Sequence, residues 1–222
     1  NNAGNWSAGL PSDAAGLGVI VSTTTTLVVN QAFNNGGDNR AEFLVTGTAG
    51  MTIEGAGSLT YLGDGLLGTT AFSVGGASTI TQTGGSLTQD GGGAGMLIGH
   101  NAVGTYNISG GNVTVLAPSP SLTLGHSAGS AGSSLNVSGS GQVDVEAGVN
   151  LVVSAGSFLN VTGGGLLVWH DRTVAETAGL AGTVNANITQ VGSDVHFTAV
   201  PEPSSAALLG LGGLAFLLRR KR

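Results

Sequence analysis

Short apolar runs rich in β-branched residues recur along the first 199 residues, and Gly or Asn bounds most of them. Examples are the runs at 27–29, 43–45, 113–115, 143–145 and 151–153. Such runs are typical of β-strands. No segment before Val200 has the apolar spacing of a helix. The pattern therefore predicts an all-β body made of short strands.

A unit of strand, glycine-rich turn and second strand is repeated through this body. The first turn glycines of the units are Gly55, Gly84, Gly110, Gly139 and Gly163, and a second marker, Gly-His, recurs at 99–100 and 125–126. The glycines follow one another at similar intervals, and the interval of the second marker agrees with theirs. This spacing predicts a parallel β-solenoid (β-helix) with coils of about 24–30 residues, because stacked coils bury a continuous apolar column. The main alternative, a β-propeller, needs about 40 residues per blade and more aromatic residues.

The C-terminal end has a different pattern, in which an apolar run at 206–218 separates a Pro-bracketed carboxylate from a basic terminus. The flanking residues are Val200, Pro201, Glu202 and Pro203 on one side and Arg219, Arg220, Lys221 and Arg222 on the other. We expect a transmembrane helix with its cations in the cytoplasm and the body outside, because Lys and Arg favour the cytoplasmic side. Thirteen residues reach only about 20 Å of a bilayer core of about 30 Å, which suits a segment that awaits processing. A core helix of a soluble domain, the alternative, leaves four consecutive cations unexplained.

The order of these features resembles the PEP-CTERM sorting signal of exported bacterial proteins. Val200-Pro201-Glu202-Pro203 matches the motif, and the Leu/Gly/Ala helix and Arg-rich terminus follow in the right order. The resemblance implies that a membrane-embedded exosortase reads the signal, cuts at the Pro-Glu-Pro region, and releases or re-anchors the exported part. It covers about the last two dozen residues, so it divides the chain into a body at 1–199 and a sorting signal at 200–222.

The ends of the body depart from the repeat. Gly/Ser/Thr/Asn-rich coils look like autotransporter passengers and other PEP-CTERM proteins, and the opening at 4–11 resembles a recurrent Asn-Trp-Ser…Pro segment in them. We expect Trp6 to cover the N-terminal end of the solenoid, with sugar stacking as the alternative. The segment 174–197 loses the glycine rhythm and is expected to form a second cap. No secretory leader precedes Trp6, so we expect one to have been removed or to lie upstream of Asn1.

The body is acidic and has no cysteine. Residues 1–199 hold 11 of the 12 acidic residues but only two basic ones, Arg40 and Arg172, which gives a charge of about −9 with His neutral. Nucleic acid is not an expected partner, because its recognition needs basic patches. The absence of Cys rules out disulfides and thiolate chemistry. An apolar fraction of 41% argues against disorder.

The densest polar cluster is His170-Asp171-Arg172 beside Trp169. Adjacent residues on a strand point to opposite faces, so His170 and Asp171 are not expected to co-operate as acid and base. A corner loop after the strand at 166–168 is the preferred interpretation.

Metal-binding and modification signals are weak. His100 and His126 occupy equivalent places in two coils and could stack, but zinc sites generally need three or four protein ligands. Acidic residues beside Gly, such as Asp64 and Asp90, show no calcium-loop spacing. Six Asn-x-Ser/Thr triplets begin at Asn5, Asn107, Asn112, Asn136, Asn160 and Asn187. We interpret them as strand-edge Asn with outward Ser or Thr, with glycosylation as the alternative.

Three functions remain as hypotheses. The first is a non-enzymatic, exported surface or extracellular-matrix protein, sorted by an exosortase-like enzyme and held by its helix in the inner membrane before processing. The second is a polysaccharide-binding module on one solenoid face, with exopolysaccharide as partner, although the spacing of Tyr61 and Tyr106 does not match the coil period and forms no aromatic ladder. The third, a β-helix polysaccharide lyase or hydrolase, needs carboxylates and a cation on one face. We predict no catalytic residue, metal or cofactor.

Overall fold

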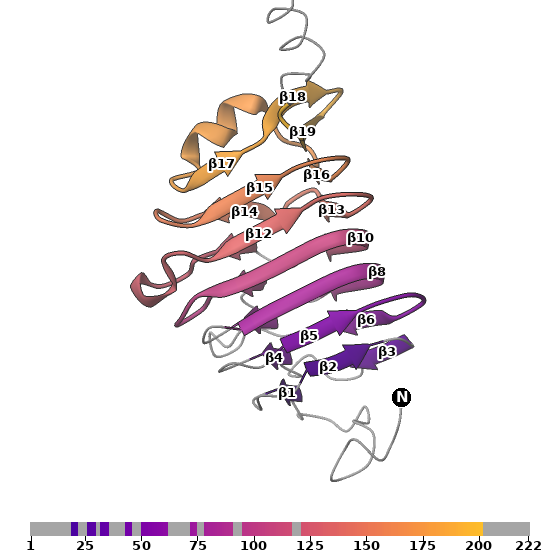
Figure 1. Cartoon of the computed structure of the whole chain (residues 1–222). Helices are drawn as coiled ribbons and strands as arrows, with labels where there is room; N and C mark the ends of the chain where they lie inside the picture. The colour runs from indigo at the N-terminus through magenta and orange to yellow at the C-terminus, as the bar shows by residue number, and fades with distance from the viewer. Residues whose placement is uncertain are drawn as a thin grey trace, which may run out of the picture.

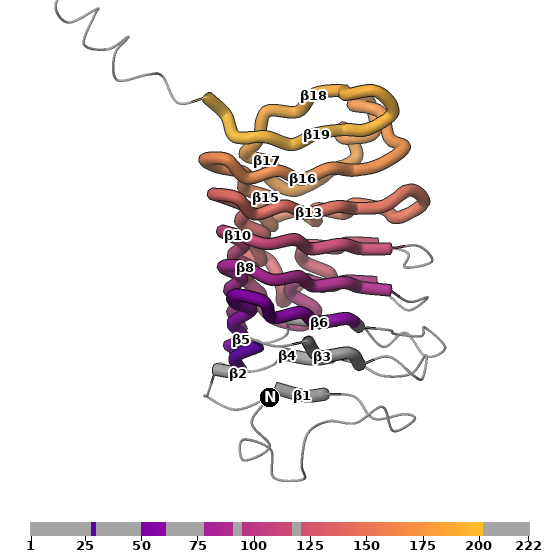
Figure 2. Tube along the Cα trace, turned by 90° about the vertical axis from the view of Figure 1, so that its right-hand side faces the viewer, coloured from indigo at the N-terminus to yellow at the C-terminus, as the bar shows by residue number. Residues whose placement is uncertain are grey.

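The computed structural model describes residues 19–21, 26–29, 32–35, 43–45, 50–61, 72–74, 78–90, 95–116 and 121–201. These residues form a β-solenoid in which strands far apart in sequence stack in parallel along one axis (Figure 1). The rungs follow one another in the order of the chain (Figure 2). The all-β solenoid expected from the repeat is therefore confirmed, whereas the helix expected at 206–218 lies outside the described residues.

Two sheets form the walls of the stack. The six-stranded sheet contains β1 (Val19–Val21), β4 (Phe43–Val45), β7 (Phe72–Val74), β9 (Met96–Ile98), β11 (Ser121–Leu124) and β14 (Asn150–Val153). The 13-stranded sheet divides into two arms that share its longest strands, β8 (Ser78–Asp90) and β10 (Gly104–Leu116). Arm 1 also contains β2 (Thr26–Val29), β5 (Gly50–Ile53), β12 (Ser134–Val137), β15 (Phe158–Val161) and β17 (Thr183–Asn185). Arm 2 also contains β3 (Ala32–Asn35), β6 (Ser58–Tyr61), β13 (Gln142–Val145), β16 (Leu166–Trp169), β19 (Asp194–Thr198) and β18 (Asn187–Val191).

The pairing confirms the predicted repeat. Ile108 pairs with Val137, and Val137 pairs in turn with Val161, so equivalent residues of successive coils lie side by side although the second step along the chain is shorter than the first. The Gly-His marker is also in register, because Ile98 and Leu124 immediately before it are paired. Coil length therefore varies, while the strands keep their register.

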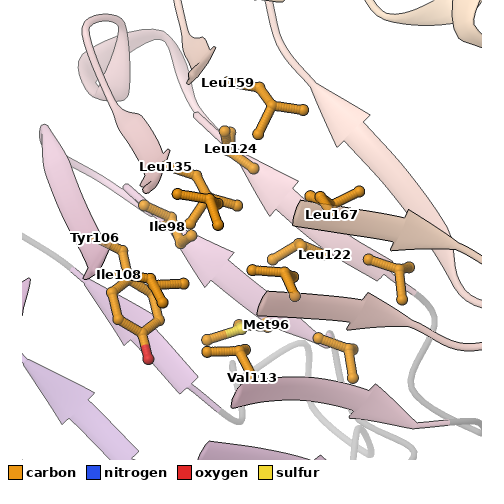
Figure 3. Close-up of a cluster of buried hydrophobic side chains, with 14 of the residues drawn as sticks. Met96, Ile98, Tyr106, Ile108, Val113, Leu122, Leu124, Leu135, Leu159 and Leu167 are labelled. Atoms are coloured by element: carbon orange, nitrogen blue, oxygen red, sulfur yellow. The ribbon is translucent and has the colours of Figure 1, made fainter. Parts of the chain in front are cut away.

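The apolar residues of equivalent strands form inward columns, as expected for stacked coils. Val113 pairs with Val143 and Val143 with Leu167, and all three side chains are buried. In arm 1 the equivalent column contains Tyr106 and Leu135 (Figure 3). Burying one such aliphatic side chain contributes about 1.5–3 kcal/mol, so the columns are the main source of stability.

The corner between the arms exists in two forms. Between β5 and β6 and in the coils after β10 it is a tight turn. In one such turn the N–H of Gly141 donates to Ser138 O at 2.8 Å and Gly139 has φ +56°. In β8 and β10 the strand instead continues through the corner with a bend. The column residues on either side are six apart in the turn coils, as at Val137 and Val143, but five apart in the bent coils, as at Gln82 and Leu87. One residue fewer leaves no room for a separate turn.

Two of the five predicted turn glycines therefore do not lie in turns. Gly84 and Gly110 lie within β8 and β10, where Gly85 and Gly111 have φ +65° and +80°. Only glycine adopts these angles without strain, and the positive φ lets the strand bend while it stays paired. The remaining predicted turn glycines, at 55, 139 and 163, lie in or beside turns.

The C-terminal end is closed by a cap that interrupts the parallel stack, as expected for 174–197. A 3-10 helix, η3 (Val174–Gly179), precedes β17, and β18 and β19 then form an antiparallel hairpin whose β19 also pairs antiparallel with β16. Phe197 and Val195 are fully buried and cover the ends of the arm 2 columns. Trp6, the expected N-terminal cover, lies outside the described residues.

Candidate functional site

The segment that leaves the cap is the start of the predicted sorting motif. Thr198, the last residue of β19, pairs with Leu166 on one side and Asn187 on the other. Ala199 is half-buried, while Val200 is 58% exposed and Pro201 is also exposed. The motif thus begins two residues after the last paired residue of the cap.

The exit segment lies beside the corner of the last full coil. Thr162 and Gly163 of that corner, Asn185 of β17, and the exit residues Val200 and Pro201 together line an open hollow. This corner is a turn closed by the N–H of Gly165, which donates to Thr162 O at 3.0 Å. The exit segment is thus placed by the last coil as well as by the cap.

The other predicted sorting residues lie outside the part of the chain that the structure describes. They are Glu202, Pro203, Arg219, Arg220, Lys221 and Arg222. Within the described residues, no helix has the length and apolar character needed to cross a membrane. Of the predicted sorting signal, the structure therefore places Val200 and Pro201.

A row of asparagine side chains runs along the outside of arm 1. The Nδ2 of Asn136 donates to Oδ1 of Asn107 at 2.8 Å, that of Asn160 to Asn136 at 2.7 Å, and that of Asn185 to Asn160 at 2.6 Å. Each bond joins one coil to the one before it, so the row is directional. We call these four residues the Asn ladder. It confirms the interpretation of three of the Asn-x-Ser/Thr triplets as strand asparagines, although the bonding itself was not predicted.

The outer face of arm 1 is uncharged. Its strand segments at 26–29, 50–53, 78–82, 104–108, 134–137, 158–161 and 183–185 contain no Asp, Glu, Lys or Arg. Within these segments two large apolar side chains are exposed, Val28 at one end and Phe158 near the other. Phe158 is 38% exposed, and its neighbours in the same row are Ser134 and Thr183. The aromatic Tyr106, in contrast, is fully buried, and burial raises its pKa well above the usual value.

The predicted polar cluster at 170–172 is a corner, and its partners come from other strands. His170 Nδ1 is 3.2 Å from Asp194 Oδ2, and its Nε2 is 3.6 Å from Asp144 Oδ1. Asp171, as expected, does not pair with His170; its φ is +51° and its N–H donates to Asp194 Oδ1 at 3.1 Å. This backbone hydrogen bond is the main reason why the pKa of Asp194 is lowered. His170 therefore joins the cap to the body.

Arg172 holds the start of the 3-10 helix against the stack. Its guanidinium lies 5.1 Å from the centre of the Trp169 ring and bonds Glu176 at 2.9 Å and Asn150 at 3.1 Å. Glu176 also accepts the N–H of Thr173 at 2.7 Å, a capping box, and this hydrogen bond is the main cause of its lowered pKa. Both carboxylate oxygens of Glu176 are therefore engaged in hydrogen bonds that hold the 3-10 helix in place.

The two equivalent histidines of the Gly-His marker lie side by side on successive coils, as the sequence suggested, with their rings tilted by 45°. The ring centres of His100 and His126 are 5.1 Å apart, and the N–H of His126 donates to Gly99 O at 2.9 Å. Across the described part of the chain, no group of three His, Asp or Glu side chains is placed to hold a metal ion. The pair is a feature of the coil repeat.

Comparison with known proteins identifies the C-terminal segment. Residues 199–222 match the family model described as the PEP-CTERM protein-sorting motif. The motif implies an exported protein that is processed by an exosortase, so the resemblance seen in the sequence is confirmed. No curated protein and no solved structure matches the chain. The match is confined to the end of the chain.

Proposed function

We propose that this chain is a non-enzymatic structural protein of the cell surface or extracellular matrix, delivered there by its sorting motif. The observation that carries the proposal is the direct attachment of the matched motif to a stack of coils that a hairpin closes at its C-terminal end. The Asn ladder joins successive coils through side-chain hydrogen bonds, and the buried columns join them through apolar contacts. A stack of this kind is suited to serve as a rigid, extended component.

The proposed route places the body outside the inner membrane before processing. The apolar segment 206–218 spans the membrane, and the cations Arg219 to Arg222 remain on the cytoplasmic side. Exosortase processing then separates the body from this anchor, which is too short for a comfortable permanent span.

Mass spectrometry of the mature protein tests this route. The full chain is expressed behind a secretory leader in a bacterial host with and without an exosortase, and the C-terminal mass is compared. We expect residues 208–222 to be lost only where the exosortase is present. Glu202→Ala should prevent the loss, and Glu146→Ala, a carboxylate at a body corner, serves as the matched control. A mature protein that retains 208–222 in the exosortase-positive host contradicts the proposal.

A second candidate function is binding of a neutral polysaccharide on arm 1. The favourable observation is the exposed ring of Phe158 within an uncharged face of hydroxyl and amide side chains, next to Asn136 and Asn160 of the Asn ladder. Aromatic rings stack on the apolar faces of sugars, and amides bond their hydroxyl groups.

Affinity electrophoresis in gels that contain dextran, hydroxyethylcellulose or alginate tests whether the protein binds a polysaccharide. We expect retardation by a neutral polymer and its loss in Phe158→Ser. Val152→Ser is the matched control, because Val152 is also 38% exposed but lies in the other sheet. Equal retardation of both variants contradicts a site on arm 1.

We propose no catalytic role for the cluster around His170, the nearest approach to a lyase or hydrolase site in the described residues. Its carboxylates already have structural partners: Asp194 accepts the N–H of Asp171, and Asp144 accepts Gln142 Nε2 at 3.0 Å. Any enzymatic activity would need further groups on this face.

A further inference from the structure

The sorting motif is attached to the folded body without a spacer. Thr198 is hydrogen-bonded within the sheet, and an extended chain covers at most about 3.6 Å per residue, so Glu202 lies within about 14 Å of Thr198. Ala206, the first residue of the apolar segment, lies within about 29 Å by the same limit. The end of the solenoid is therefore held close to the membrane for as long as the segment 206–218 is inserted.

The strand that carries the motif, β19, does not readily detach from the cap. β19 lies between β16 and β18, and its side chains Val195 and Phe197 are fully buried at the ends of the columns. Moving the motif away from the body would require breaking pairs on both sides of Thr198 and exposing Phe197. Opening of this kind costs more than fraying of an ordinary terminus.

The surface of the body beside the exit segment permits close approach of another protein. Thr162 and Gly163 form the corner, and Asn185 forms the end of the Asn ladder, so the hollow is lined by small, uncharged residues of the body. Val200 and Pro201 form its other wall and present their free sides to solvent. Glycine at such a corner lets another backbone come near, because no side chain projects from it.

We propose that the processing enzyme docks on this last-coil corner as well as on the motif, so that the substrate surface it recognises is composite. The proposal rests on exosortase processing of this chain. The short connection supports this proposal, because an enzyme that binds 200–203 is brought against Thr162, Gly163 and Asn185. The surface of the enzyme outside the membrane therefore has to be complementary to these three residues. The partner is thus a membrane-embedded protein whose outer surface is complementary to a small, uncharged corner.

Lengthening the connection tests the composite surface. Eight Gly/Ser residues are inserted between Thr198 and Ala199 of the full chain, and processing is followed by pulse-chase in the exosortase-positive host. We expect a severalfold slower loss of 208–222, because the corner and the motif no longer act as one surface. Unchanged or faster processing overturns the proposal. Thermal unfolding of the full chain with and without the insertion confirms that the fold is retained.

A bulky substitution on the corner gives an independent measurement. Thr162→Trp should slow processing severalfold without changing thermal unfolding, whereas Ser109→Trp should leave the rate unchanged. Both residues are exposed and lie at the corner between the arms, but Ser109 belongs to an earlier coil. Equal rates for Thr162→Trp and the parent chain would falsify docking on the corner. If the parent chain itself is not processed, the proposed sorting fails as well, so the two failures are distinguishable.

Discussion

The full coils of both arms of the large sheet are stacked parallel strands, but the hydrogen bonds of their polar side chains run in different directions. In arm 1 the asparagines bond from coil to coil, as from Asn136 to Asn107 at 2.8 Å, and Asn136 adds a longer bond of 3.4 Å to Ser134 in its own strand. In the parallel coils of arm 2 the bonds lie within one strand, as from Asn112 to Thr114 and from Gln142 to Asp144, and the cap hairpin adds a bond between strands, from Asn187 to Thr198. Side chains two apart on a strand share a face, and so do equivalent residues of stacked strands, so both patterns are available to any solenoid. Arm 1 uses them to fix register, while arm 2 retains a carboxylate with which His170 joins the cap.

The arms also differ at their C-terminal ends, and this difference should give the largest effect on stability. Phe197 closes the arm 2 column and is fully buried, whereas Val184 at the end of arm 1 is only half-buried. Phe197→Ala should lower the free energy of unfolding by about 3–5 kcal/mol, and Val184→Ala by about 1 kcal/mol. Urea unfolding followed by circular dichroism measures both. Equal losses would mean that the hairpin does not seal arm 2.

β8 contains two fully buried glutamines, one in each arm, whose side chains differ in hydrogen bonding. Gln82 Oε1 accepts the hydroxyl of Tyr106 at 2.5 Å and its Nε2 donates to Asn112 O, whereas neither polar side-chain atom of Gln89 has a partner among the described residues. An unpaired buried polar group costs about 1–3 kcal/mol. Gln82→Leu should therefore destabilise the protein by about this amount, because it leaves the Tyr106 hydroxyl unpaired, and Gln89→Leu should stabilise it. A shift of the unfolding midpoint in the same direction for both variants would contradict this interpretation of the core.

Loss of a bond in the Asn ladder, which lies in arm 1 alone, should lower the stability by a smaller amount. Asn136→Ala removes one donated and one accepted bond between coils, together with the longer bond to Ser134 in its own strand, and should cost about 1–2 kcal/mol. Asn112→Ala in arm 2 removes only a bond within its own strand and should cost less than about 0.5 kcal/mol. Hydrogen exchange of the amides in β12 and β15 should show faster opening in Asn136→Ala only. Similar costs for the two variants would show that bonding between coils adds nothing.

The smallest expected effect is the pH dependence of the cap on arm 2. The pKa of Asp194 is lowered in the folded state, chiefly by the N–H of Asp171, so its carboxylate stabilises the fold above the ordinary carboxyl pKa of about 4. This contribution is lost as the pH falls through the lowered folded-state pKa. Asp194→Asn should therefore reduce the melting temperature at pH 7 and flatten its decline on acidification. Parallel melting curves for both proteins between pH 7 and pH 3 would rule out this role.

The sequence predicted the stack well because its signal is periodic. Val113, Val143 and Leu167 recur at the coil spacing, and only an inward column satisfies that recurrence. The cap was predicted by loss of the same period between 174 and 197. Its antiparallel hairpin was not predicted, because Gly192, with φ +63° between β18 and β19, resembles any other corner glycine of the chain.

The remaining features depend on small differences of spacing and on partners far apart in sequence. Gly-Gly at 84–85 and Gly-x-Gly at 139–141 both indicate a corner, yet one residue decides between a bent strand and a turn. The partners of His170 lie on strands about one coil before it and one coil after it. Its position next to Asp171 in the sequence therefore gave no indication of these partners. The Asn ladder carried a usable signal, because its asparagines recur at the coil period.

The antiparallel hairpin at the C-terminal end has a consequence for assembly. Parallel, in-register strands with stacked asparagines are the geometry of amyloid fibrils, in which each layer is a template for the next. In this molecule the direction of the chain reverses at β19, and β18 then presents an edge on which another parallel coil would find no matching register. On the other arm the edge strand β17 has only three residues, too few for a strong template. A single reversal thus lets the protein use fibril-like stacking within one chain while it limits the growth of that stack.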